Sequence, residues 1–228
     1  MDLRYLKNLN SFTEDDQFKI NTTTVLIIGL GGLGGFVVDF LSRLGVQKIK
    51  LLDFDTFDTS NLNRQLLSTQ KNIGSFKAIE AKKYINSVNS CIEVEVFCNK
   101  FEECDFNFLF KNVNVVFDCC DNIKTKLNIE NQCQFFKIPL IYGAVAGYFG
   151  QVACILPEYP ILKKIYPKEH SSGIENKLGN LCFIVSIIAS LQISLFINLI
   201  LNISNNNLYG FYYIDIENYE IQWISFKI

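Results

Sequence analysis

A short apolar segment followed by closely spaced glycines constrains this chain most. Residues 24–35 read TVLIIGLGGLGG, and a helical pattern follows directly. Gly29, Gly31 and Gly34 therefore spell G-x-G-x-x-G at a strand-to-helix turn, and Asp53 ends the next predicted strand nineteen residues later. Glycines let a backbone approach phosphate, and such an acid accepts hydrogen bonds from ribose hydroxyls. We interpret the unit as a nucleotide-binding turn rather than a merely structural one.

Predicted strands and helices alternate over the first two thirds of the chain. Strands are predicted at 24–29, 48–55, 92–97, 113–118 and 138–144, and helices at 36–45, 76–88 and 122–136. After them we expect a strand at 148–157, an irregular loop at 158–180, an apolar helix at 181–201, and a hairpin of strands 210–216 and 219–226. This order predicts an α/β fold in one domain, 1–228: a Rossmann-like, mostly parallel sheet flanked by helices, with antiparallel C-terminal strands.

The composition excludes several classes of protein. A formal charge of −2 and a pI near 5.5 give no basic face, so we expect no nucleic-acid partner. Eight cysteines without a secretory signal at the start are typical of reduced thiols in the cytoplasm. No CxxC spacing occurs, which leaves a structural zinc site without sequence support.

The segment 181–201 carries no charge over twenty-one residues, a length that also suits a membrane span. Gln192 and Asn198 interrupt it, and serines recur every four residues as a small-residue stripe suited to close packing, at Ser186, Ser190 and Ser194. We therefore favour a buried core helix and expect no membrane. A membrane span and an exposed interaction helix remain the alternatives.

Two cations follow the nucleotide-binding turn. The block SNLNRQ, residues 60–65, lies beyond the second strand, where such sheets place their ligands, and Lys77 begins the next helix. Arg64 and Lys77 can stabilise charge on a reacting phosphate, whereas hydride transfer does not need two cations there. The alternative is that both are ordinary surface residues.

The segment VVFDCCDN, residues 115–122, presents a further acid at the same edge of the sheet. An aspartate beside a triphosphate commonly holds magnesium, which assigns that role to Asp121. Asn122 can cap the next helix or contact the base. Cys119 and Cys120 are interpreted as small packing residues, with a redox pair as the alternative. Asp118 receives no catalytic role; it can end the strand by a local hydrogen bond.

In the order of its motifs the chain resembles the ThiF/MoeB/HesA family, bacterial relatives of ubiquitin-activating enzymes. The similar blocks include VLIIGLGGLGG, KLLDFDTFDTSNLNRQLL, NIGSFKAIEAKKYIN, VVFDCCDN and IASLQISLFINLIL. The resemblance implies an ATP- and Mg²⁺-dependent adenylyltransferase that activates the C-terminal glycine of a ubiquitin-like sulfur carrier, of the ThiS or MoaD type, and releases pyrophosphate. Thiamine or molybdopterin synthesis would be the pathway.

The resemblance also implies site residues and partners. The expected catalytic residues are Arg64, Lys77 and Asp121, with Asp121 as the magnesium ligand. Nucleotide contacts are expected at Gly29, Gly31, Gly32, Gly34, Asp53, Asn61, Arg64, Gln65, Lys77, Asp121 and Asn122. The nucleotide-binding part would span about 20–145 and the carrier-binding part about 146–228. Expected partners are a second copy in a homodimer, a small β-grasp carrier ending in Gly-Gly, and a cysteine desulfurase or other sulfur donor.

Three departures from the family pattern matter. Lys7 stands where the family has an arginine that reaches the other subunit's ATP, so a trans-subunit contact is assigned to Lys7. The family's zinc-binding CxxC pairs are missing, so no structural zinc is expected and packing around the loop 158–180 must replace it. The loop 158–180 contains no cysteine, and we expect it to be mobile without the carrier. Its His170 is expected at the surface. A catalytic thiol at Cys182, just after the loop, is a minor alternative.

Other functions remain open at this stage. A degenerate family member would bind nucleotide or a partner without turnover, and an NAD-dependent oxidoreductase would use the same glycine turn. Relatives that activate tRNA-linked or peptide carboxylates form a further alternative.

Overall fold

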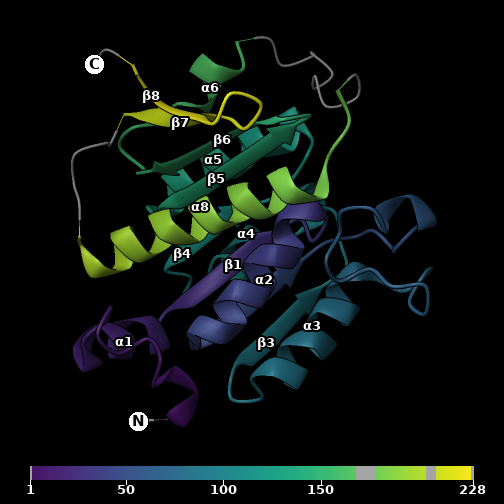
Figure 1. Ribbon diagram of the computed structural model, residues 1–228, viewed down its shortest axis with the longest axis vertical. Coiled ribbons are helices and arrows are strands. Elements are labelled where there is room, and N and C mark those ends of the chain that lie inside the picture. Colours follow the sequence, from purple (N-terminus) through teal and green to yellow (C-terminus); the bar gives the residue numbers. More distant parts are fainter. Residues whose placement is uncertain (1, 168–177, 204–208, 227–228) are drawn as a thin grey trace.

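The computed structural model describes residues 2–167, 178–203 and 209–226. Its eight strands form one sheet in the order β3-β2-β1-β4-β5-β6-β7-β8 (Figure 1). The strands are β1 (Thr24–Ile28), β2 (Lys48–Leu52), β3 (Glu93–Phe97), β4 (Val115–Asp118), β5 (Leu140–Ala146), β6 (Phe149–Ile155), β7 (Gly210–Asp215) and β8 (Glu220–Ser225). Strands β1 to β5 run parallel, and β6, β7 and β8 join antiparallel. The predicted fold class is confirmed.

Helices cover both faces of this sheet (Figure 1). They are α1 (Glu14–Asn21), α2 (Gly32–Leu44), α3 (Lys77–Val88), α4 (Phe106–Leu109), α5 (Ile123–Phe136), α6 (Leu162–Ile165) and α8 (Cys182–Leu201). Short 3-10 turns occupy Leu3–Tyr5, Thr59–Asn61 and Phe101–Glu103. The helices α1, α4 and α6 were not predicted. Helix α6 lies in the segment 158–180 that was expected to be irregular, which corrects that expectation in part.

The central strands are apolar on both faces because both faces are covered. In β1, Val25 and Ile27 pack on the side of α2, α3 and α8, while Leu26 and Ile28 pack on the side of α4, α5 and α6. All five residues of β1 are buried. One continuous apolar run therefore contributes to two cores.

The strand order reverses direction beside β1. The chain first builds outward from β1 through β2 to β3, and then returns to place β4 on the other side of β1. The loops that follow β1 and β4 therefore diverge and leave a crevice at the carboxyl ends of these strands, where open α/β sheets bind their ligands.

Helix α8 is the one helix of the described residues that is long and apolar enough to cross a membrane by length and composition. It packs on α2, β5 and β6, and buries Ile184, Val185, Ile188, Ala189, Gln192 and Phe196. Gln192 is fully buried and donates to the backbone oxygens of Asp118 (3.2 Å) and Ile141 (3.4 Å). One face of α8 therefore packs in the core, as favoured from the sequence, while 33% of its most apolar 18-residue window is buried in all.

The serine stripe of α8 does not make this contact, so that part of the prediction was wrong. Ser190 and Ser194 are exposed, and the hydroxyls of Ser186 and Ser190 bond back to their own helix. Close packing comes instead from glycines of the sheet: a Cβ at Gly143 or Gly150 would collide with α8. The small residues that allow close packing therefore belong to strands β5 and β6, and not to α8.

Packing occurs around the start of the loop 158–180, where the resemblance led us to expect packing in place of zinc. The carboxylate of Glu130 in α5 accepts from the backbone nitrogens of Ile161 (2.8 Å) and Leu162 (2.9 Å), where α6 begins. The ammonium of Lys164 lies 4.5 Å from the ring centre of Tyr209 and 5.5 Å from that of Phe226. We call these contacts the α6 clasp. Among the described residues no three His, Cys, Asp or Glu side chains are grouped for a metal, and the clasp itself contains a single carboxylate.

Candidate functional site

The turn after β1 requires two of its glycines. Gly29 has φ of +89°, and a Cβ there would lie 2.8 Å from the backbone oxygen of Cys119. A Cβ at Gly34 would lie 2.0 Å from the oxygen of Gly29. Because these two glycines have no side chains, the turn packs tightly against the loop that follows β4. Helix α2 begins at Gly32, so the free N–H groups and the positive dipole end of α2 face the crevice.

Asp53 joins this turn to the end of β2. Its Oδ2 accepts from the backbone nitrogen of Leu30 (2.6 Å), and its Oδ1 accepts from that of Asp55 (2.8 Å). Burial raises the pKa of Asp53, and the two backbone donors oppose that shift. Each oxygen has a second lone pair, so the carboxylate can still accept from a ribose hydroxyl.

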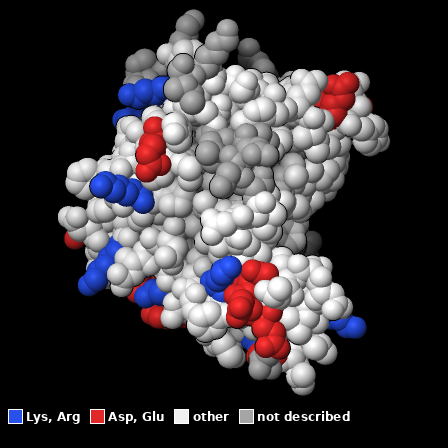
Figure 2. All heavy atoms as spheres, turned by 90° about the vertical axis from the view of Figure 1, so that its left-hand side faces the viewer, with Lys and Arg blue, Asp and Glu red and all other residues white. Residues whose placement is uncertain are grey.

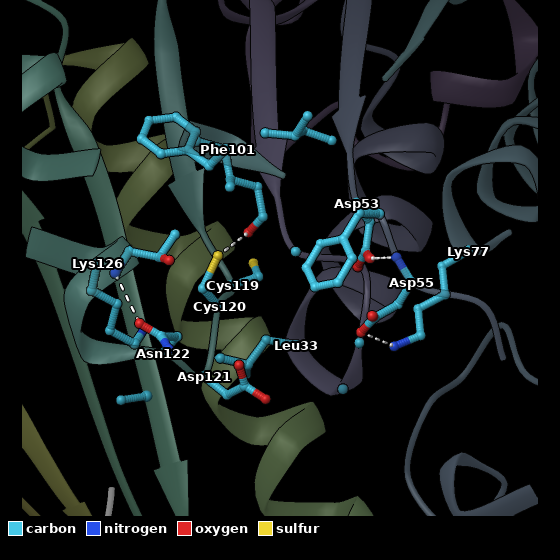
Figure 3. A pocket seen from close by; sticks show the side chains of 18 of the residues that line it. Leu33, Asp53, Asp55, Lys77, Phe101, Cys119, Cys120, Asp121, Asn122 and Lys126 are labelled. Atoms are coloured by element: carbon cyan, nitrogen blue, oxygen red, sulfur yellow. Dashed lines mark hydrogen bonds and ion pairs between the residues drawn. The ribbon is translucent and has the colours of Figure 1, made fainter. Parts of the chain in front are cut away.

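These elements surround a hollow, here called the central hollow, with about 1150 Å³ of empty space including its open mouth. Figure 3 shows Asp53, Asp55 and Lys77 on one wall and Asp121, Asn122 and Lys126 on the other. Of the predicted site residues it is lined by Gly29, Gly31, Gly32, Asp53, Arg64, Gln65, Lys77, Asp121 and Asn122. Gly34 and Asn61 lie outside the lining. Gly34 acts on the turn's packing, while the Asn61 side chain accepts from the backbone nitrogen of Asp58 (3.1 Å).

The two predicted cations come from different elements. Lys77 is 6% exposed at the start of α3, and its ammonium pairs with the Asp55 carboxylate at 3.2 Å. Arg64 is half-buried and donates to the backbone oxygen of Ser60 (3.0 Å) and to Asn63 (2.8 Å). Both therefore sit at the hollow already oriented by neighbours, and the surface-residue alternative does not describe Lys77.

Asp121 projects into the hollow, across from Asp55 and Lys77 (Figure 3). It is exposed, and in the described chain no hydrogen bond or ion pair holds its side chain. Asn122 caps α5 by accepting from the backbone nitrogen of Thr125 (3.1 Å), which is one of the two roles expected for it from the sequence. Asp118 makes the expected local bond, accepting from the nitrogen of Cys120 (3.0 Å).

Cys119 and Cys120 directly precede Asp121 and form no disulfide. The Cys119 thiol is buried against Gln192, and the Cys120 thiol lies 3.4 Å from the oxygen of Ile28. Burial raises the pKa of both thiols far above the ordinary range, so neither forms a thiolate readily. This supports packing over redox chemistry.

Two buried oxygens at the hollow have no partner among the described residues. They are Oε1 of Gln65, which is 7% exposed, and Oδ1 of Asn180. A buried acceptor without a donor costs about 1–3 kcal/mol. Both oxygens suit a ligand that brings hydroxyl or amino donors, and ATP has such donors on its ribose and adenine. The residues present therefore fit the expected nucleotide.

Sequence reasoning missed several residues at this hollow, among them Asp55, Lys126, Tyr166 and Asn180. One signal was available for Lys126: it stands between the apolar residues Ile123 and Leu127 on the buried side of α5, where a charge is uncommon. Tyr166 and Asn180 come from loops, so no periodic pattern could place them.

Lys7 lies far from the central hollow of its own chain. It is exposed beyond Tyr5, which packs against Gly45 after α2 and accepts from Asn89 after α3 (2.8 Å). The hollow is at the opposite ends of both helices.

Figure 2 shows one side of the molecule, where basic and acidic side chains are intermixed rather than gathered into a basic surface.

His170 belongs to residues 168–177 of the loop 158–180, which lie outside the described residues, so the expectations for this part of the loop stay untested. Cys182 is the first residue of α8 and is exposed.

The ThiF family model matches residues 4–228. The molybdopterin-synthase adenylyltransferase of Haemophilus influenzae is 34% identical over 198 residues, covering 84% of this chain and 81% of the relative. The SAMP-activating enzyme E1 of Haloferax volcanii is 27% identical over 159 residues, covering 70% of this chain and 59% of the relative. E. coli MccB in its structure with ATP has a TM-score of 0.79 at 20% identity, covering 99% of this chain and 72% of that one. The chain therefore belongs to the ThiF family.

Proposed function

We propose that this protein uses ATP to activate the C-terminal carboxylate of a ubiquitin-like sulfur carrier as an acyl-adenylate, releasing pyrophosphate. The chain is an adenylyltransferase, as its relatives are; the proposal adds the acceptor, a small β-grasp protein of the ThiS or MoaD type ending in Gly-Gly. The observation that carries it is the central hollow, where the glycine turn, two cations and one unpaired carboxylate converge.

The reaction needs alignment and charge stabilisation more than proton transfer. A terminal carboxylate is ionised at neutral pH, so it attacks the α-phosphorus without a general base. The new bond joins a carboxylate oxygen to that phosphorus, and the bond to the pyrophosphate oxygen breaks. Holding both reactants in one crevice supplies much of the rate enhancement.

Each wall of the hollow has a part in this scheme. The start of α2 at Gly32 offers backbone N–H groups to the phosphates, and Asp53 holds the ribose. Arg64 and Lys77 stabilise the charge that develops as pyrophosphate leaves. Lys77 reaches phosphate by leaving Asp55, which is its partner in the free protein.

Asp121 is the proposed magnesium ligand. Magnesium in nucleotide sites takes one or two protein carboxylates and completes its shell with phosphate and water, so a single unpaired carboxylate suits it. When bound, the ion neutralises phosphate charge. Asp121 itself would supply a negative oxygen from the wall of the hollow that faces Lys77.

The test is ATP–pyrophosphate exchange with a carrier peptide ending in Gly-Gly. We expect Asp121→Ala, Arg64→Ala and Lys77→Ala each to lower exchange on the order of a hundredfold or more while the protein stays folded. Arg43→Ala is the matched control, because Arg43 is an exposed cation of α2 paired with Asp39 outside the hollow. Near-normal exchange in all three variants would contradict the assignment, and a wild type that binds ATP without exchange would indicate a degenerate member.

A further inference from the structure

An ion pair is buried directly beneath the loop that carries Asp121. Asp118, the last residue of β4, is 0% exposed, and Lys126 in α5 is 2% exposed. The Lys126 ammonium lies 3.0 Å from Oδ2 of Asp118. Burial raises the pKa of Asp118, and the neighbouring Lys126 opposes that shift. A buried pair of this kind often adds little net stability compared with apolar residues of similar volume, which leaves room for a role at the site.

The ammonium of Lys126 is held between two strands of the sheet. Besides Asp118 of β4 it donates to the backbone oxygen of Gly143 in β5 at 2.8 Å, and it lies 4.9 Å from the centre of the Tyr142 ring. An ammonium has three donors, and two of them are used within the protein before any ligand binds. Lys126 lines the central hollow, but these contacts hold its charge against the sheet.

The pair holds both ends of the short loop between β4 and α5. On the strand side, Oδ1 of Asp118 accepts from the backbone nitrogen of Cys120 at 3.0 Å. On the helix side, Lys126 is the fourth residue of α5, and its backbone nitrogen donates to the oxygen of the cap Asn122 (3.0 Å), which follows Asp121 directly. Because the Asp121 side chain has no partner of its own in the described chain, its position depends on the backbone of this loop.

We propose that Asp118 and Lys126 are positioning residues, which fix the loop 119–122 so that Asp121 meets the magnesium ion of bound ATP. The inference rests on the proposed function only for the identity of the ligand, ATP with Mg²⁺. Groups that orient a metal ligand without touching the metal typically contribute 10- to 100-fold to metal affinity or activity.

The experiment measures ATP affinity by isothermal titration, once with Mg²⁺ and once with EDTA, and takes the ratio. We expect Lys126→Met to lower this magnesium-dependent ratio by roughly tenfold, while Lys126→Arg keeps it close to the wild type. In the background of Asp121→Asn, Lys126→Met should cause no further fall, because it acts through Asp121.

Two variants separate positioning from folding. Asp118→Asn with Lys126→Met removes both charges, so it should regain thermal stability yet keep the lowered ratio. Lys50→Met is the matched control: Lys50 is 4% exposed and donates to the backbone oxygens of Phe108, Leu109 and Lys111, outside the hollow. It should lose stability and keep the wild-type ratio.

Several results would overturn the inference: a double variant with the wild-type ratio, a wild type whose ATP binding ignores Mg²⁺, or Lys126→Met weakening ATP binding equally in EDTA. The last would mean that Lys126 contacts the nucleotide itself. If the variants show the predicted ratios relative to the wild type but the wild type shows no ATP–pyrophosphate exchange, the proposed function is refuted and the positioning role is supported.

Discussion

At the scale of single residues, burial decides what the cysteines beside Asp121 can do. Burial raises the pKa of the Cys119 and Cys120 thiols, while Cys91 and Cys182 are exposed. Iodoacetamide at pH 8 should therefore modify Cys91 and Cys182 in the folded protein and spare the adjacent pair, because the thiolate is the reacting form. Mass spectrometry of the digested protein measures this. Rapid modification of Cys120 in the native state would revive the redox alternative, and all four should react in denaturant.

The residues that could be predicted from the sequence belong to one local motif or end a strand. Gly29 and Asp53 were recognisable because a strand, a turn and a helix surround them in sequence. Asp121 was recognisable because parallel strands end at one edge of a sheet. The pair of Asp118 and Lys126 could not be predicted from the sequence. These residues are eight positions apart, and the lysine meets the aspartate only because α5 packs back against the sheet, where Lys126 also bonds to Gly143 of β5.

At the scale of elements, the α6 clasp shows how a short helix can be held without a metal. Glu130→Ala would leave the buried backbone nitrogens of Ile161 and Leu162 without their acceptor. We expect this to cost about 2 kcal/mol or more, because each unsatisfied buried donor costs about 1–3 kcal/mol. The melting temperature should fall by roughly 4–8 °C for a chain of this size.

Glu158→Ala is the matched control for this prediction, because Glu158 is exposed near the same helix. Its melting temperature should stay that of the wild type. Adding EDTA should not shift the melting temperature of either protein. A drop on chelation would show that a metal, and not the clasp, secures this segment.

Long periodic elements were predictable and short ones were not. The pattern of α5 was predicted within one residue, since fourteen residues give several turns of signal. Helix α1 has a readable start, because Thr13 and Asp16 form a capping box, but its apolar positions are too few to form a stripe. The serines of α8 do share one side of the helix, but that side is exposed instead of packed on a neighbour. A helix that is apolar all round does not reveal from its sequence which side is covered.

At the scale of the whole molecule, the N-terminal segment lies near the C-terminal end of α2 (Figure 1), whereas Gly32 and Leu33 at the start of α2 line the central hollow. Thirteen residues of helix span about 20 Å. Tyr5 is held at the far end by Gly45 and Asn89, so Lys7 does not reach the hollow of its own chain. If Lys7 contacts ATP at all, the nucleotide is bound by another subunit. The resemblance assigned Lys7 to the ATP of the other subunit, and its place in the fold excludes a contact within one chain.

Subunit complementation tests this arrangement. In a twofold dimer, a subunit with Lys7→Ala paired with one carrying Asp121→Ala has one site with both residues intact. If each variant alone is nearly inactive, co-expression should restore about a quarter of wild-type exchange, since half of the dimers are mixed and each has one working site. Pairing Arg64→Ala with Asp121→Ala is the control, because both residues line the same hollow and neither site is repaired. Absence of recovery in the first pair, with mixed dimers verified by mass, would show that Lys7 does not act across subunits.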